Sequence, residues 1–339
     1  MTVDEQHLDE RKERILREIV EGYVRRGEPV GSKIVADAAD LGVSSATIRN
    51  EMAILERDGY ISHPHTSAGR IPTDKGYRYY VDVLAPKVAL EPTRRREIEH
   101  FLAGAVSALD ELLERTSQVL AELTDYTSLA SAPPVYESAL ERIELVRLGG
   151  SRLLLVCIGD EGWHDERLVD LAAEVSDDNL AQSVRIANTL VARKTATEAA
   201  RILSEAVVAT DVEPILRVVS DALRAVARAG GRVFTGGMAK LIVWEPVDTA
   251  QRVLEMLDSG GVEPLLPVPS PNAMTVRIGR ELALEDLRDL SLIATGYRFG
   301  KRAGTLGVLG PTRMDYPSVM STVAEVASTL SRVLRQLSQ

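Results

Sequence analysis

The sequence is poor in cysteine and in long hydrophobic runs. Cys157 is the single cysteine among 339 residues, so no disulfide can form within the chain, which is typical of proteins from a reducing compartment. The longest aliphatic run, LLLVCI, is much shorter than the ~20 residues that a membrane-spanning helix needs. The first residues, MTVDEQHLDERKE, are acidic and polar and do not resemble a signal peptide. We therefore expect a cytoplasmic protein that does not enter a membrane.

The chain also lacks an excess of positive charge, because its formal net charge is −10 at pH 7. This excludes a protein that is basic over its whole surface, but a local basic patch is compatible with it, since the field depends on where charges gather. Acidic residues slightly outnumber basic ones in residues 1–86, whereas residues 70–78 are basic apart from Asp74. The charge count therefore neither favours nor excludes binding to nucleic acid.

Patterns typical of enzymes are missing as well. Cys157 lies inside an apolar run, which favours a buried thiol over a nucleophile. His63 and His65 flank a proline but have no cysteine or carboxylate cluster nearby, so we expect a loop contact or exposed side chains there and no metal site. Glycine-bearing stretches at 232–238 and 304–314 do not match a phosphate-binding loop. We expect no catalysis, no metal and no cofactor.

What the sequence does contain is a short amphipathic pattern at residues 45–57, SATIRNEMAILER. At about 100° per residue, Ile48, Met52 and Leu55 fall on one side of a helix, which we expect to be buried. Ser44 or Ser45 is placed to cap its start. The opposite side carries Ala46, Asn50, Ala53 and Arg57, with Thr47 and Arg49 on its flanks.

The surrounding sequence favours a DNA-binding motif. A helix expected at 32–38 precedes this one at helix-turn-helix spacing, which places the second helix in the major groove. There Arg pairs with guanine and Asn with adenine. Two extended pieces at 60–62 and 70–73 then flank a polar loop, as in a hairpin wing, with Arg70 at its base. The candidate DNA-binding residues are Ser44, Ser45, Thr47, Arg49, Asn50, Arg57, His63, His65, Arg70, Lys75 and Arg78.

Each of these residues also has a simpler interpretation. Most polar helix faces contact water and nothing else, and the helix expected at 74–82 could be a lid whose tyrosines pack inward. The combination of preceding helix, turn and hairpin favours DNA, because a solvated face requires none of these.

The remaining chain predicts a larger domain with an insertion. Residues 87–97 have the composition of a linker, and an amphipathic helix follows from about 92 to 126. Strand-like runs then precede and follow a helical block at 178–229, and RVFTGGMAKLIVWE is expected to form two strands. The apolar faces of the helical block could form an interface or fill their own core. Strands on both sides of a helical block indicate one α/β sheet domain that an insertion interrupts.

Several stretches together resemble the family of bacterial heat-inducible transcription repressors called HrcA. The match is carried by the longer stretches VSSATIRNEMAILERDGYISHPHTSAGRIPTDKGYRYYVD and LSLIATGYRFGKRAGTLGVLGPTRMDY, and by the shorter PVGSKIVAD, FTGGMAKLI and VRIGRE. The resemblance extends over nearly the whole chain. It implies an α+β multidomain protein with an N-terminal winged helix-turn-helix, a GAF-like α/β domain and a dimerisation domain inserted into it.

With these domains the expected boundaries are 1–86 for the winged helix and 87–97 for the linker. The GAF-like domain takes 98–177 and 247–339, and the mainly helical insertion takes 178–246. The resemblance further implies repression of chaperone operons through an inverted-repeat operator in double-stranded DNA. It implies activity that depends on the chaperonin and is lost on heat stress. An inverted repeat is matched by a homodimer, since its half-sites are related by a two-fold axis.

A second function is kept beside this one. A winged-helix regulator could use the GAF-like domain as a pocket for a small molecule, with the glycine-bearing stretches at 232–238 and 304–314 as its lining. A specific ligand would then raise the melting temperature.

Overall fold

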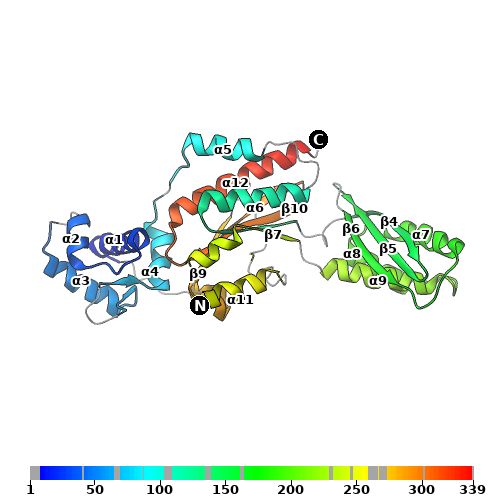
Figure 1. The fold of residues 1–339 in the computed structure, drawn as a ribbon, viewed down its shortest axis with the longest axis horizontal. Helices are drawn as coiled ribbons and strands as arrows, with labels where there is room; N and C mark the ends of the chain where they lie inside the picture. The colour runs from blue at the N-terminus through cyan, green and yellow to red at the C-terminus, as the bar shows by residue number, and fades with distance from the viewer. Residues whose placement is uncertain are drawn as a thin grey trace. The chain divides into compact units, whose positions relative to one another are not determined.

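The computed structural model describes residues 8–39, 42–64, 69–86, 88–102, 109–133, 139–160, 164–228, 232–244, 247–258, 266, 273–300 and 302–337. The chain forms two compact units. The first contains residues 1–130, 234–297 and 305–330, and the second contains residues 131–233, 298–304 and 331–339. Helices are combined with three separate sheets (Figure 1), which confirms the expected mixture of α and β structure.

The N-terminal part of the first unit, residues 8–84, is called the head. Its first helix, α1 (Glu10–Arg26), buries Ile15 and Ile19 and ends at Gly27, whose φ of 69° closes the helix. The other elements are α2 (Ser32–Ala39), α3 (Ser45–Arg57), β1 (Ile61–Ser62), β2 (Ile71–Pro72), α4 (Asp74–Tyr79) and the π-helical turn η1 (Tyr80–Leu84). β1 and β2 pair as an antiparallel hairpin.

A five-stranded sheet in the order β7-β3-β10-β9-β8 forms the centre of the remaining chain. Its strands are β3 (Thr127–Ser131), β7 (Val233–Gly236), β8 (Met274–Ile278), β9 (Leu290–Phe299) and β10 (Arg302–Pro311). β9 and β10 are buried almost throughout, as expected of central strands in a covered sheet. α6 and α12 lie across one face (Figure 1).

The helices around this sheet differ in one place from the sequence-based expectation. Their bounds are α5 (Pro92–Leu102), α6 (Leu109–Thr124), α10 (Leu241–Trp244), α11 (Val247–Asp258) and α12 (Tyr316–Leu337), with 3₁₀ turns η4 (Met238–Lys240), η6 (Gly279–Leu282) and η7 (Glu285–Leu287). The predicted helix 92–126 corresponds to α5 and α6, and residues 103–108 lie outside the described residues. The prediction of a second strand after β7 is wrong, because the apolar run LIVW forms α10.

The second unit is a three-stranded sheet covered by three helices. The strands β4 (Leu140–Gly149), β5 (Arg152–Gly159) and β6 (His164–Asp170) pair antiparallel in this order. α7 (Asp177–Val191), α8 (Ala196–Glu205) and α9 (Glu213–Arg228) pack on one face of this sheet (Figure 1). Their buried side chains, among them Leu180, Leu203 and Leu216, share one core with Ile143 and Leu155 of the strands.

This arrangement moves the expected limits of the insertion. The segment between β3 and β7, which are neighbours in the five-stranded sheet, contains all of β4 to α9. The expected limits were 178–246, with strands 140–170 assigned to the domain of the larger sheet. Alternation of apolar residues shows which side of a strand is buried but not which sheet it joins. The apolar faces of α7, α8 and α9 fill the core of their own unit, so they are not exposed to a partner.

Candidate nucleic-acid interface

The helix α3 has its expected orientation. Ile48, Met52 and Leu55 are buried, which confirms the predicted apolar side. Arg49 and Asn50 are exposed, because at about 100° per residue they point away from that side. This face of the head therefore presents a guanidinium and a carboxamide to the solvent.

The start of α3 is fixed by its cap. The hydroxyl oxygen of Ser44 accepts a hydrogen bond from the backbone N–H of Thr47 at 3.2 Å, and the two hydroxyl groups lie 3.1 Å apart. This is an ordinary N-cap, which satisfies one of the unpaired amides of the first turn. Ser45, the first helical residue, is exposed. Exposed amides at a helix N-terminus carry partial positive charge, so this end of α3 suits a phosphate group.

Both acidic residues of α3 are paired within the head. Glu51 lies 3.7 Å from the charged groups of Arg11 and of Lys12 on α1. Glu56 contacts Arg70 at 2.8 Å and the ring of His63. Since the carboxylates are turned toward basic partners, the outward face of α3 keeps the positive charge of its arginines.

Arg70 is held at the base of the hairpin by its backbone as well as by Glu56. Its N–H donates to the carbonyl oxygen of Val30 and its carbonyl oxygen accepts from the N–H of Val30, both at 2.9 Å. Gly69 permits this approach, because a Cβ there would lie 2.6 Å from the Val30 backbone. His63 is exposed near the end of β1, and the predicted site residue His65 lies outside the described residues.

Burial raises the pKa of Glu56, but its hydrogen bond with His63 and the charge of Arg70 outweigh burial and hold that pKa below its ordinary value. Glu56 is therefore ionised at neutral pH. As a carboxylate it attracts Arg70 and accepts a hydrogen bond from a protonated ring nitrogen of His63. The hairpin is thus joined to α3 by charge as well as by packing.

The helix α4 contributes less to the exposed face than the sequence suggests. Thr73 caps it by accepting from the N–H of Gly76 at 3.2 Å. The ammonium group of Lys75 donates to the carbonyl oxygen of Asp58 at 2.8 Å and lies 4.1 Å from the centre of the Tyr60 ring. Tyr77 and Tyr80 are buried, which confirms the alternative interpretation that these tyrosines pack inward.

Arg78 is the candidate whose position differs most from a DNA contact. Its guanidinium forms a two-pronged contact with the carboxylate of Glu281, 203 residues away in the sequence. Sequence reasoning did not include Glu281, since the motif VRIGRE alone gives no sign of which residue it meets. Arg57 at the end of α3 stays largely exposed and donates to the neighbouring Asp58 at 3.1 Å.

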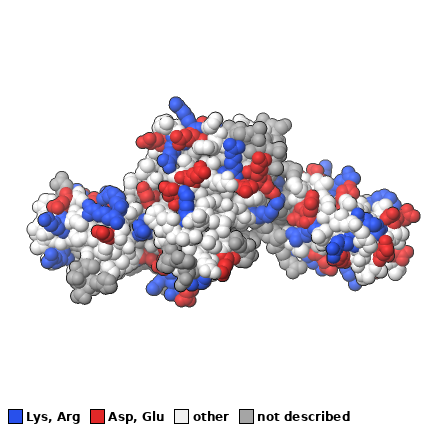
Figure 2. Space-filling view, viewed as in Figure 1, with Lys and Arg blue, Asp and Glu red and all other residues white. Residues whose placement is uncertain are grey.

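The distribution of charge shows why composition was uninformative. Where Figure 2 colours the visible surface, Lys and Arg side chains are interspersed with Asp and Glu and do not merge into one broad basic area. The candidate interface is therefore a local arrangement around α3 and the hairpin, which suits recognition by a few side chains.

Comparison with known proteins identifies the family. A family model described as the C-terminal domain of HrcA protein matches residues 110–320. A heat-inducible transcription repressor HrcA from Acidothermus cellulolyticus is 42% identical over 97% of this chain and 99% of the relative. The protein of the same name from Thermobifida fusca is 42% identical over 98% of this chain and 99% of the relative. The chain belongs to the HrcA family. This confirms the resemblance drawn from the sequence motifs.

A solved structure supports the HrcA-family fold. A crystal structure of a hypothetical protein at 2.2 Å resolution matches 98% of this chain and 100% of its own length, with a TM-score of 0.64 and 24% sequence identity. At that identity the likeness concerns the fold. The head lies outside residues 110–320, and the two HrcA relatives extend into it because they match 97% and 98% of this chain.

The glycine-bearing stretches considered as a ligand pocket are packing sites in this HrcA-family chain. A Cβ on Gly236 would lie 2.3 Å from the carbonyl oxygen of Ser117, and one on Gly310 would lie 2.7 Å from the Tyr126 ring. These glycines let neighbouring segments approach closely.

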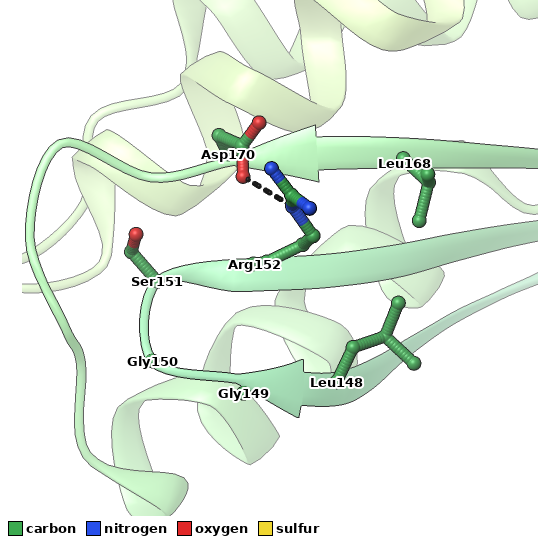
Figure 3. Close-up of a pocket in the computed structure, with 7 residues that line it drawn as sticks. All are labelled: Leu148, Gly149, Gly150, Ser151, Arg152, Leu168 and Asp170. Atoms are coloured by element: carbon green, nitrogen blue, oxygen red, sulfur yellow. Dashed lines mark hydrogen bonds and ion pairs between the residues drawn. The ribbon is translucent and has the colours of Figure 1, made fainter.

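Open hollows occur elsewhere, in the second unit. One lies at the turn between β4 and β5, where Arg152 and Asp170 pair at 3.0 Å beside Leu168 (Figure 3). A second runs between β6 and α9. Neither includes the glycine-bearing stretches, and a ligand-sensing function is not favoured by the family.

The single cysteine of the chain, Cys157, is buried. Burial raises the pKa of the Cys157 thiol to about 12, so it stays protonated at neutral pH and is a poor nucleophile. Within the described ranges, no three His, Cys, Asp or Glu side chains gather as metal ligands. None of the described helices is long and apolar enough to cross a membrane.

Proposed function

We propose that this protein is a transcription repressor that binds double-stranded DNA through a winged helix-turn-helix in its head. The observation that carries the proposal is the exposure of Asn50 on the side of α3 opposite its buried residues and of Arg49 on the flank of that side. α2, the turn before α3 and the β1–β2 hairpin have the order that a winged helix requires. Arg and Asn can each pair with two atoms of a base in the major groove.

Other residues of the head would position it on the sugar–phosphate backbone. Ser44, Ser45 and Thr47 lie at the positively polarised start of α3. Arg57 and Lys75 carry their charges near the end of the same helix. Such contacts supply affinity that depends on salt and little sequence preference.

The repressor would act as a homodimer on an inverted repeat. Two identical recognition helices related by a two-fold axis match two half-sites related by the same symmetry. In this proposal the five-stranded sheet with its helices is the GAF-like domain, and the β4–α9 segment is the inserted dimerisation domain.

The proposal also covers heat induction. The relatives are named heat-inducible transcription repressors, and the resemblance implies chaperone operons as targets and the chaperonin as a partner that supports the active form. Proteins unfolded by heat would then occupy the chaperonin and relieve repression. Operator binding should be weaker when the refolded protein is assayed without chaperonin than with it.

The central test is selection from random duplexes by the full-length protein. We expect the enriched sequences to be inverted repeats. Replacing Arg49 or Asn50 with Ala should then cost about 1–3 kcal/mol of discrimination at the base that each side chain contacts. Affinity for the selected and a scrambled duplex, measured by fluorescence anisotropy at fixed salt, gives this difference.

A matched control is Arg25→Ala, which removes an exposed arginine from α1. It should leave the ratio between selected and scrambled duplexes unchanged. If both α3 variants keep the full sequence preference of the unmodified protein, α3 is not the recognition helix.

A further inference from the structure

Arg78 of α4 connects the head to the five-stranded part of the same unit. Its Nε donates to Glu281 Oε1 at 3.0 Å and its Nη2 to Glu281 Oε2 at 2.5 Å. Nη2 also donates to the carbonyl oxygen of Val276 at 2.6 Å, and Nη1 donates to Asp82 at 3.1 Å. All three nitrogens of the guanidinium are therefore used within the chain. Paired contacts of this kind fix geometry as well as distance.

The receiving surface is shaped for α4. Glu281 is held in place because its Oε2 accepts from the N–H of Ile278 at 2.9 Å. Asp74, at the start of α4, accepts from the N–H of Arg280 at 3.2 Å. Gly279 has φ of 53°, and a Cβ there would lie 2.6 Å from the Asp74 carboxylate. Glycine at 279 is favoured by this left-handed backbone conformation, and a side chain there would displace the Asp74 carboxylate.

Two further contacts keep the head from rotating about α4. The buried rings of Tyr77 and Tyr316 lie 5.8 Å apart between their centres. The guanidinium of Arg313 lies against the end of α1, where a Cβ on Gly27 would be 3.4 Å from its Nη1. α1 and α4 of the head thus each contact residues 313–316 of the same unit. Two such contacts restrict the orientation of the head as well as its distance from the five-stranded sheet.

We propose that Asp74, Arg78, Gly279 and Glu281, named the clamp, are positioning residues for operator recognition. The clamp fixes the direction of each recognition helix relative to the five-stranded sheet of the same unit, so it removes one source of variation in the separation of the two helices in a dimer. This inference rests on the proposed function. Arg78 thereby acts on DNA binding through the position of α3, without touching DNA.

The physical reason lies in how the second half-site is bound. Once one head is on DNA, the other binds at an effective concentration that depends on how well its position matches the second half-site. A head freed from the clamp samples many orientations and is less often correctly placed. Affinity for one half-site depends on the head alone and should stay the same.

The experiment compares the affinity of Glu281→Ala with that of the unmodified full-length chain for three kinds of duplex. These are a single half-site, the selected inverted repeat, and inverted repeats lengthened or shortened by one or two base pairs. We expect half-site affinity within about twofold of the unmodified protein and a loss on the order of tenfold or more on the inverted repeat. The dependence on spacing should become weaker.

Exchanging the charges of Arg78 and Glu281 tests whether their ion pair supports affinity for the inverted repeat. Arg78→Glu and Glu281→Arg should each lower affinity for the inverted repeat, and the double variant should recover part of it, since the ion pair is restored in reverse. A matched control reverses Arg95 and Glu325, which pair at 3.2 Å between α5 and α12 and lie outside the clamp. This control should leave the affinity for all three kinds of duplex unchanged.

Hydrogen exchange of residues 276–282 gives a readout without DNA, and exchange there should rise in Glu281→Ala and fall again in the double variant. If Arg78→Glu lost affinity equally for the half-site and the inverted repeat, with a smaller salt dependence, Arg78 would contact phosphate and the inference would be overturned. Unchanged affinities would overturn it too. If the unmodified chain shows no preference for an inverted repeat, the proposed function fails as well. This result is distinct from the two outcomes above, which concern the variants.

Discussion

Glu56 connects α3 to both sides of the hairpin. It contacts His63 after β1 and Arg70 before β2, and its carboxylate is largely shielded from water. A carboxylate with two partners of this kind resists the separation of the elements that it joins, since moving them apart would break its contacts with both. The angle between α3 and the hairpin is therefore set at this residue.

Glu56→Gln should loosen the hairpin at neutral pH. The pKa of Glu56 is lowered in the folded protein, so ionisation favours the folded state above the unfolded pKa of about 4.3. This contribution is lost as the pH falls through the lower folded value. Protection of residues 58–73 against hydrogen exchange should thus be lower in the variant at pH 7, and the difference should shrink toward pH 4.

Glu28→Gln changes an exposed carboxylate of the head and should not alter that protection at either pH. A difference between Glu56→Gln and the unmodified protein that grew on acidification would contradict the assigned role.

The local pattern of α3 was readable from the sequence because it depends on helical periodicity alone. Burial of Ile48, Met52 and Leu55 follows from spacing. The partner of Arg78 was not readable, since Glu281 lies 203 residues away and no periodicity relates the two. An exposed arginine on a short helix looks the same in the sequence whether it meets phosphate or a carboxylate.

At the scale of elements, α4 packs closely against the start of the hairpin within the head. A Cβ on Gly76 would lie 2.1 Å from the carbonyl oxygen of Tyr60, so α4 approaches the end of α3 and β1 more closely than any other residue allows. Thr73 supports the same approach by donating its hydroxyl to the carbonyl oxygen of Gly59 at 2.6 Å. The glycine in the motif DKGYRYY is thus explained by packing.

Gly76→Ala should destabilise the head, although alanine favours helices by about 1 kcal/mol over glycine. The methyl group would meet rigid backbone, and overpacking of this kind costs about 1–3 kcal/mol or more. We expect faster hydrogen exchange in residues 58–80 and weaker DNA binding. Gly31→Ala is the matched control, because a Cβ there meets no described atom within 4 Å. Equal exchange in the two variants would show that α4 can move away at little cost.

The same reasoning shows where element prediction failed. The runs LLLVCI and LIVW are both short and apolar, yet the first forms β5 and the second forms α10. Short apolar runs do not distinguish strand from helix by periodicity. The sequence likewise did not predict which sheet each strand joins, since this depends on contacts between distant segments.

At the scale of the whole molecule, the second unit has an uncovered apolar surface. Val146, Leu154 and Leu168 are paired neighbours across β4, β5 and β6, on the face opposite the helices. Val146 is 47% exposed and Leu168 is 64% exposed. The helices that were expected to form an interface fill their own core, so this row is the surface of the unit that we propose for contact with a second copy.

Val146→Glu with Leu168→Glu should weaken the dimer, because carboxylates placed in an apolar interface lose hydration without gaining partners. Sedimentation equilibrium should show a shift toward monomer, and affinity for the inverted repeat should fall toward that for a half-site while the head stays folded. Val207→Glu, at a fully exposed position of the same unit, should change neither. A dimer of unchanged strength in the double variant would move the contact to another surface. In the proposed mode of binding each head contacts one half-site, so monomers that keep full affinity for the inverted repeat would contradict that mode.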